Sequence, residues 1–109
     1  MTQAMRYLLN TPILTHYGDY RFDGPLPLHA ARAFVEQPTQ SAIGHPATAQ
    51  FLSQRLGQPV PCQREAIHMQ PGDQALVLRL LHRLPEGAVL DGAALATASH
   101  EFGLLTRLR

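Results

Sequence analysis

The clearest structural signal in the chain is the stretch REAIHMQPGDQALVLRLLH, residues 64–82. Residues 74–82 are its most hydrophobic run, and such a run next to a turn is typical of a central strand. The tetrapeptide QPGD at 70–73 has Pro second and Gly third, the pattern of a tight turn. We therefore predict an antiparallel hairpin that joins a strand over 64–69 to a strand over 74–82.

Further strands are expected on both sides of this hairpin. Short apolar or alternating runs predict them at residues 5–10, 20–24, 39–43 and 101–109. With 109 residues and 12.0 kDa, the chain has the size of one domain. The expected fold class is α+β (mixed α/β): a single domain over 1–109, with a mixed sheet of about five strands flanked by helices.

Two helices are predicted from apolar residues at helical spacing. The first lies within 25–37, and its shared face consists of Leu28, Ala31, Phe34 and Val35. The second runs over 45–57, with Pro46 in its first turn and Gly57 as its C-terminal cap. Its predicted buried face consists of Phe51, Leu52, Arg55 and Leu56. A short Ala-rich helix or lid segment is expected at 91–99.

The charge composition excludes several classes of protein. The formal net charge is +1, and charged residues make up 16% of the chain. These values exclude a disordered tail, a highly charged coiled coil and a strongly basic protein that binds nucleic acid mainly by salt-dependent charge attraction. All nine positive residues are Arg and none is Lys. This bias reflects either a GC-rich genome or arginines that grip phosphate with their planar guanidinium groups.

The remaining composition points to a cytoplasmic protein that needs no metal or other cofactor. Cys62 is the one cysteine, so an internal disulfide is impossible and the thiol suits a reducing compartment. No apolar run is long enough for a secretory signal or a membrane span, so no membrane partner is expected. The histidines are scattered, without the spacing of a metal site.

A first candidate site is the segment SAIGHP at 41–46, where a predicted strand bends at Gly44 into a predicted helix. The N-terminus of a helix attracts anions, and Gly44 allows a ligand to approach the backbone closely. His45 at this point is placed to donate a proton to a leaving oxygen of a bound phosphate. The competing interpretation is that His45 caps the helix or lies on the surface.

A second candidate site lies on the hydrophobic strand. Alternation places Val77, Arg79 and Arg83 on one face of the strand, and two arginines there are unusual. They either contact the phosphates of an oligonucleotide or pair with carboxylates such as Glu65 and Glu86. An exposed or salt-bridged sheet face is the alternative.

Four motifs taken together resemble a known family. They are YLLNTPILT (7–15), SAIGH (41–45), HMQPGDQALV (68–77) and RLPEG (83–87). In this order they resemble the ring nucleases found as viral anti-CRISPR proteins against type III systems, with similar copies in bacterial genomes. The resemblance implies a small α/β domain that forms a homodimer. It also implies that the dimer binds cyclic tetra-adenylate across its two-fold axis and cleaves it without a metal.

The resemblance carries over to individual residues. His45 matches the catalytic histidine, whereas Arg83 and Glu86 match a second active-site cluster. Asn10 matches a polar residue that lines the site, and Arg64 matches an arginine that contacts the ligand. Position 79 departs from the pattern, because an amide such as Gln is expected there and this chain has Arg79. That departure puts the ligand contact of Arg79 in doubt.

The implied reaction is attack by the 2′-hydroxyl of the RNA on the neighbouring phosphate, which gives linear di-adenylate with a 2′,3′-cyclic phosphate end. His45 would donate the proton to the 5′-oxygen, and Arg83, with Arg64, would stabilise charge. Glu86 would orient an arginine or help to deprotonate the 2′-hydroxyl. Two alternatives stay open: a module that binds cyclic oligoadenylate without cleaving it, and a regulatory protein that contacts a host protein. The expected setting is the cytoplasm of a prokaryotic or virus-infected cell.

Overall fold

The strand predicted to be central lies in the middle of the sheet. This strand is β4 (Gln74–Leu80), and the strand order is β2-β5-β4-β1-β3. On one side of β4 lie β1 (Arg6–Leu9) and β3 (Gln40–Ser41). On the other side lie β5 (His100–Arg107) and β2 (Tyr20–Leu26). The computed structural model describes residues 4–10, 16–63, 67–80 and 100–109.

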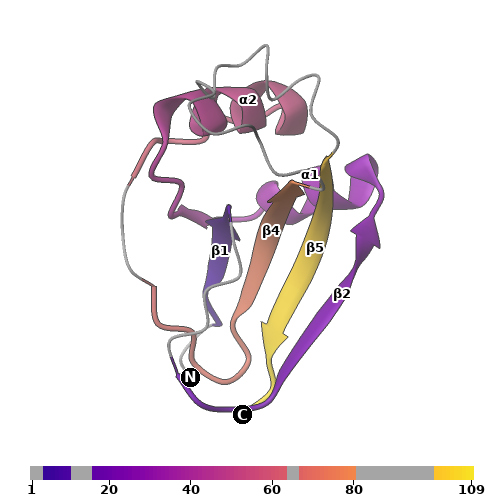
Figure 1. The fold of residues 1–109 in the computed structure, drawn as a ribbon, viewed down its shortest axis with the longest axis vertical. Coiled ribbons are helices and arrows are strands. Elements are labelled where there is room, and N and C mark those ends of the chain that lie inside the picture. The colour runs from indigo at the N-terminus through magenta and orange to yellow at the C-terminus, as the bar shows by residue number, and fades with distance from the viewer. Residues whose placement is uncertain (1–3, 11–15, 64–66, 81–99) are drawn as a thin grey trace.

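The directions of the strands make the sheet mixed. β1 is parallel to both β3 and β4, whereas β5 is antiparallel to both β4 and β2. β5 is thus the one strand that runs against the others, as Figure 1 shows. The predicted α+β fold with a five-stranded mixed sheet is confirmed. It also follows that β1, β3 and β4 end at the same edge of the sheet, which we call the carboxyl edge.

The predicted hairpin is wrong, although its turn is right. Asp73 N–H donates to the carbonyl of Gln70 at 2.9 Å, and Gly72 has the positive φ of 94° that favours glycine. However, both sides of β4 are occupied by β1 and β5, and 67–69 form no strand. Because β4 is apolar on both faces, it fits a parallel neighbour in the middle of the sheet better than a local hairpin.

Both predicted helices exist and cover the same face of the sheet. They are α1 (Leu28–Val35) and α2 (Pro46–Leu56), and in Figure 1 α2 lies across the end at which β1 and β4 finish. Their apolar residues form one core with Leu76 and Leu78 of β4. Pro46 is the first residue of α2, and Gly57 ends the helix in the left-handed conformation, with φ of 72°. Both end signals are therefore confirmed.

The buried face of α2 differs from the prediction at one position. Phe51, Leu52 and Leu56 are buried as expected, but Arg55 is exposed, and its carbonyl accepts a hydrogen bond from Arg32 Nε. A guanidinium one turn after Phe51 and Leu52 has no acidic partner in the apolar core, so it stays in solvent.

The opposite face of the sheet also contains buried apolar residues. Ala75 and Val77 of β4 form a second cluster with Tyr7, Leu9 and Leu105, and Met69 packs with them. The predicted alternation along the strand is confirmed for 75–79, since Leu76 and Leu78 face the helices. The C-terminus lies at the edge opposite the carboxyl edge (Figure 1). The predictions for 91–99 fall outside the described residues.

Candidate functional site

Four of the predicted site residues lie at or next to the carboxyl edge. Asn10 follows β1, Gly44 and His45 follow β3, and Arg79 is near the end of β4. The register that pairs Leu8 with Ser41 and Leu9 with Val77 aligns these strand ends. Ligands in sheets of this kind bind outside the carboxyl ends of the parallel strands. Arg64, Arg83 and Glu86 lie outside the described residues.

The segment between β3 and α2 is fixed by hydrogen bonds on both sides. Ala42 N–H donates to the carbonyl of Leu8 at 3.0 Å, which continues the pairing of β3 with β1. Ser41 Oγ donates to the carbonyl of Pro61 at 2.7 Å and accepts from Ile43 N–H at 3.3 Å. Gln63 N–H, one residue before Arg64 in sequence, donates to the carbonyl of Ile43 at 2.8 Å. The backbone that leads to His45 is therefore held in one position.

His45 occupies the N-cap position of α2 without making a capping bond. Its backbone is extended, with φ of −114° and ψ of 124°, and its carbonyl accepts the N–H of Ala49 at 3.0 Å. Its side chain is exposed and forms no hydrogen bond to the helix end. The first turn of α2 also contains no acidic residue. The first turn of α2 itself therefore supplies no negative side chain to the N-terminal end of the helix dipole, which favours an external anion.

The backbone conformation at position 44 does not require a glycine. Among the described residues, positive φ angles occur at Gly18, Gly57 and Gly72. The role predicted for Gly44 is to let a ligand approach the backbone closely, and this role depends only on the small size of glycine.

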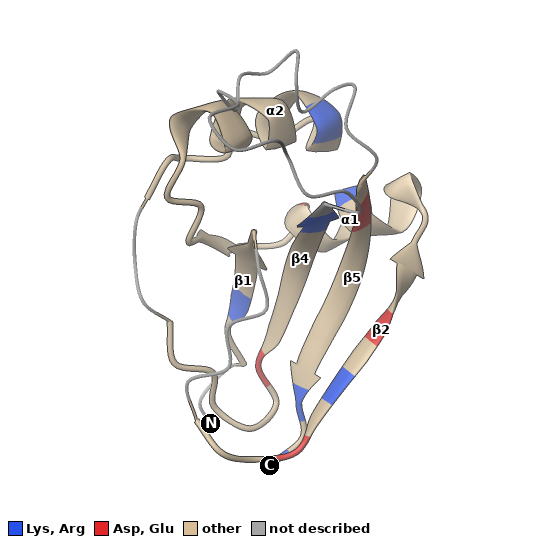
Figure 2. Ribbon diagram, viewed as in Figure 1, with Lys and Arg blue, Asp and Glu red and all other residues tan. Residues whose placement is uncertain are grey.

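Arg79 has a carboxylate partner that the sequence analysis did not name. Its Nη1 lies 2.7 Å from Glu101 Oε1, and the two residues are paired directly across β4 and β5. The guanidinium also lies 6.0 Å from the ring centre of Phe22. The salt-bridged sheet face that was one interpretation is thus correct for Arg79. Figure 2 shows that the other basic positions of the described residues are spread over β1, β2, β5 and both helices, not gathered on one element.

His100 is a residue at this edge that the sequence analysis missed. It begins β5 opposite Leu80, and its ring packs edge-on against Phe51 of α2 with 5.1 Å between ring centres. Phe102 contacts the same ring at 5.9 Å. A signal existed in the sequence, because His100 directly precedes the predicted strand 101–109. The contact of His100 with Phe51 of α2 depends on the tertiary fold, so the sequence spacing of the two residues does not predict it.

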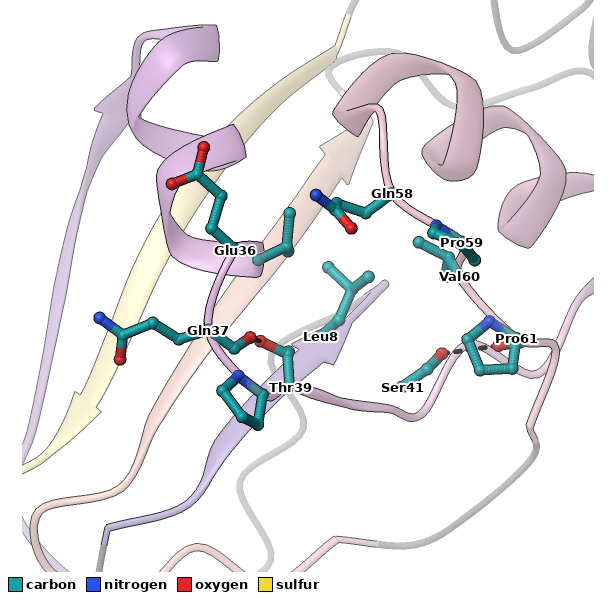
Figure 3. A pocket seen from close by; sticks show the side chains of 11 residues that line it. Leu8, Glu36, Gln37, Thr39, Ser41, Gln58, Pro59, Val60 and Pro61 are labelled. Carbon is teal, nitrogen blue, oxygen red and sulfur yellow. Dashed lines mark hydrogen bonds between the residues drawn. The ribbon is translucent and has the colours of Figure 1, made fainter.

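Among the hollows formed by the described residues, three lie beside these elements, and Asn10, Gly44 and His45 line none of these three. The first, of about 310 Å³, lies beside edge strand β3 between the ends of α1 and α2 (Figure 3). Its walls are mostly aliphatic and proline side chains, with the Ser41–Pro61 hydrogen bond at one side. The second, of about 530 Å³, surrounds Arg6. The third, of about 150 Å³, is lined by Phe22, Arg79 and Glu101.

The described part of the chain contains neither a cluster of metal ligands nor a helix that could span a membrane. Among residues 4–10, 16–63, 67–80 and 100–109, no three His, Cys, Asp or Glu side chains come together as metal ligands. Within the same residues, neither helix has the length and apolar character needed to cross a membrane.

The fold defines a small α+β protein with a five-stranded mixed sheet and two helices, whose candidate site lies where the parallel strands end. The chain belongs to the STIV B116-like family, whose sequence profile matches residues 6–102. It is similar to the solved structure of B116 of Sulfolobus turreted icosahedral virus, with a TM-score of 0.72 and 20% identity. That match covers 95% of this chain and 100% of the viral one, and at this identity it shows the fold alone.

Two further relatives come from a bacterium and a virus. YddF of Bacillus subtilis (strain 168) is 31% identical over 103 residues, which cover 92% of this chain and 94% of YddF. ORF117 of Acidianus two-tailed virus is 48% identical over 50 residues, which cover 46% of this chain and 43% of ORF117. The chain thus has similar proteins in both a bacterium and a virus.

Proposed function

We propose that the protein is a ring nuclease that cleaves cyclic tetra-adenylate without a metal ion and so switches off a type III CRISPR response. The observation that carries the proposal is the shared location of Asn10, Gly44, His45 and Arg79 at the carboxyl edge. This common location supports the interpretation that motifs far apart in the sequence contribute to one site. The membership in a family with viral members agrees with an anti-defence role.

The reaction needs three contributions from the protein. The 2′-hydroxyl of one adenylate attacks the adjacent phosphorus, a P–O bond forms, and the bond to the 5′-oxygen breaks. His45 donates a proton to that 5′-oxygen, and the free N-terminus of α2 holds the phosphate. Arg83, Arg64 and Glu86 complete the site in this proposal. The arginines stabilise charge on the phosphate, and Glu86 orients an arginine or helps to remove the proton of the 2′-hydroxyl, which passes to solvent. Two such cuts give two linear di-adenylates, each with a 2′,3′-cyclic phosphate.

The proposed working unit is a homodimer. One protomer of 109 residues presents one copy of His45 and one α2 N-terminus. A ring of four equivalent adenylates has symmetry that includes a two-fold axis, so a two-fold dimer supplies each contact twice. Two protomers that meet at their carboxyl edges would enclose the ring between two helix ends.

A second candidate function is sequestration of the ring without cleavage. Arg79 favours it, because the pair with Glu101 replaces the amide that the resemblance leads us to expect at this position. In this alternative the site binds the phosphates but holds none of them in line for attack.

Incubation of the protein with cyclic tetra-adenylate in EDTA tests both proposals. The nuclease yields linear di-adenylate, whereas a sequestering protein binds the ring and leaves it intact under enzyme excess. If the protein neither binds nor cleaves the ring, the result favours the third alternative, a regulatory contact with another protein.

A single substitution then tests whether His45 is the general acid. His45→Ala is expected to slow cleavage about 10²–10⁴-fold and to leave ring binding largely intact. His29→Ala is the matched control, because His29 is an exposed histidine on α1. Cleavage by His45→Ala at the parent rate would remove His45 from the mechanism.

A further inference from the structure

Arg6 lies at the edge of the sheet opposite the candidate site, inside the largest of the three hollows. It is the first residue of β1 and is paired with Gln74, the first residue of β4. The hollow of about 530 Å³ falls within the size range of small-molecule sites. Its polar side chains are those of Arg6, Gln37, Thr39, Gln40 and Gln74, and none of its lining residues is acidic. Among the described residues, the lining of the hollow therefore carries one positive charge and no counter-charge.

The guanidinium of Arg6 is partly buried and incompletely paired. Its Nη2 donates to the carbonyl of Phe34 at 2.9 Å, and its Nη1 makes a long bond of 3.4 Å to Gln74 Oε1. Its Nε is buried without a partner, and no carboxylate of the described residues lies within ion-pair distance. Burial lowers the pKa of Arg6, which is the mark of a charge removed from water without a counter-ion.

Three other arginines in the described part of the chain have an acidic partner, and Arg107 is saturated by backbone carbonyls. Arg21, Arg79 and Arg109 each form an ion pair with an Asp or Glu at the surface. Arg32 is exposed and donates to a backbone carbonyl. Arg6 combines partial burial, an unpartnered nitrogen and a hollow that is free of acidic side chains.

The surrounding protein explains why the charge is tolerated, but it does not neutralise it. The guanidinium stacks on Phe34 at 3.9 Å, and the Phe34 carbonyl belongs to the negative end of the α1 dipole. Both contacts are with neutral groups. A guanidinium gains most from a carboxylate or phosphate, whose two oxygens match its parallel N–H groups.

We propose that this hollow binds a small organic anion through its carboxylate or phosphate group. The anionic group pairs with Arg6, and the amide and hydroxyl groups around it bond the rest of the ligand. This site is independent of the proposed nuclease site, because Arg6 begins β1 and the other site lies where β1 ends.

Thermal unfolding of the full chain in phosphate, acetate and chloride at equal ionic strength tests the proposal. We expect phosphate, acetate or both to raise Tm with saturation, by roughly 4–8 °C at about five times the dissociation constant. The two anions show which group the site prefers. An equal response to chloride would overturn the proposal, because ionic screening requires no site.

Two pairs of variants locate the effect. Arg6→Gln should abolish the anion-dependent rise, whereas Arg32→Gln, on exposed surface of α1, should keep it. Because Arg6→Gln also removes the stacking on Phe34, Gln37→Glu provides a test that preserves this contact. Gln37 is exposed and lines the hollow, so a carboxylate there supplies the missing counter-charge.

Gln37→Glu should therefore raise Tm in the absence of anion and lose the anion response. Gln54→Glu, an exposed position on α2 with the same change of charge, should retain that response. If Gln37→Glu responds to phosphate and acetate as the parent does, the site is not at Arg6. The unfolding measurements test the hollow around Arg6, and the cleavage assay tests the carboxyl edge. Failure of this proposal is therefore distinguishable from failure of the proposed nuclease.

Discussion

Arg79 and Glu101 form an ion pair of 2.7 Å directly across the central strand pair β4 and β5. Their side chains are 50% and 23% exposed, so the pair stands at the surface of the carboxyl edge. Such surface ion pairs contribute about 0–1 kcal/mol to stability. A bound phosphate can therefore take the place of Glu101 as the partner of Arg79 at little cost. The positive charge of Arg79 is thus already partly neutralised before any ligand binds.

Substitution of each partner separates the two roles of this pair. Glu101→Gln releases Arg79, and under the proposed function it should tighten binding of cyclic tetra-adenylate about 2–5-fold at low salt. Arg79→Gln should weaken binding by a similar factor. Titration calorimetry measures both, with Arg21→Gln as a control because Arg21 forms a comparable surface pair with Asp23. Parent-like affinity in both variants would show that Arg79 does not contact the ring.

Asp73 is expected to be among the most important residues for stability. It is 3% exposed, and its two carboxylate oxygens accept the N–H groups of Met5 and Gln70 at 2.8 Å each. Asp73→Ala leaves both donors without this partner and should cost about 2–4 kcal/mol in the free energy of unfolding. Urea unfolding checks this value. Asp23→Ala, which removes an exposed carboxylate, should cost less than about 1 kcal/mol.

Gly57 ends α2 in a conformation that other residues adopt at a cost. Its φ is 72°, and a side chain there would meet no atom within 4 Å, so the effect is one of backbone strain alone. Gly57→Ala should lower the free energy of unfolding by about 1 kcal/mol, and Gly57→Asn by less. Thermal unfolding distinguishes them. Equal Tm values for the three proteins would contradict this explanation.

Ser41 and Ser53 provide a matched pair of hydroxyls, since each bonds the connector after α2. Ser41 Oγ donates to the carbonyl of Pro61, and Ser53 Oγ accepts the N–H of Val60 at 2.8 Å. Replacement of either by Ala should cost about 1–3 kcal/mol by chemical unfolding. Under the proposed function, Ser41→Ala should also slow ring cleavage, because Ser41 precedes the fixed segment that leads to His45. A similar slowing in Ser53→Ala would indicate a general loss of structure.

The elements themselves were predictable where local chemistry dominates. The apolar faces of α1 and α2, the proline and glycine at the ends of α2 and the turn at 70–73 all follow from local preferences and were confirmed. The predicted hairpin was not confirmed, because strand pairing depends on segments that lie far apart in the sequence. Arg6 and Gln74 are partners in the sheet although 68 residues separate them.

The candidate site was predictable in its residues but not in its contacts. The SAIGH motif placed His45 at the start of a helix, as the structure has it. The partner of Arg79 was missed, since Glu101 becomes its neighbour only when β5 pairs with β4. His100 was missed for the same reason, because its contact with Phe51 requires α2 to pack over the sheet.

The amino-acid order alone establishes an α+β domain, its helices, its central strand and a histidine at a helix start, because short-range sterics and hydrophobic periodicity act between near neighbours. The tertiary fold establishes which strands are adjacent, and with them the carboxyl edge, the Arg79–Glu101 pair and the hollow around Arg6. These features join residues that are distant along the chain, so they arise only when burial of the two apolar faces of β4 selects one arrangement of its neighbours.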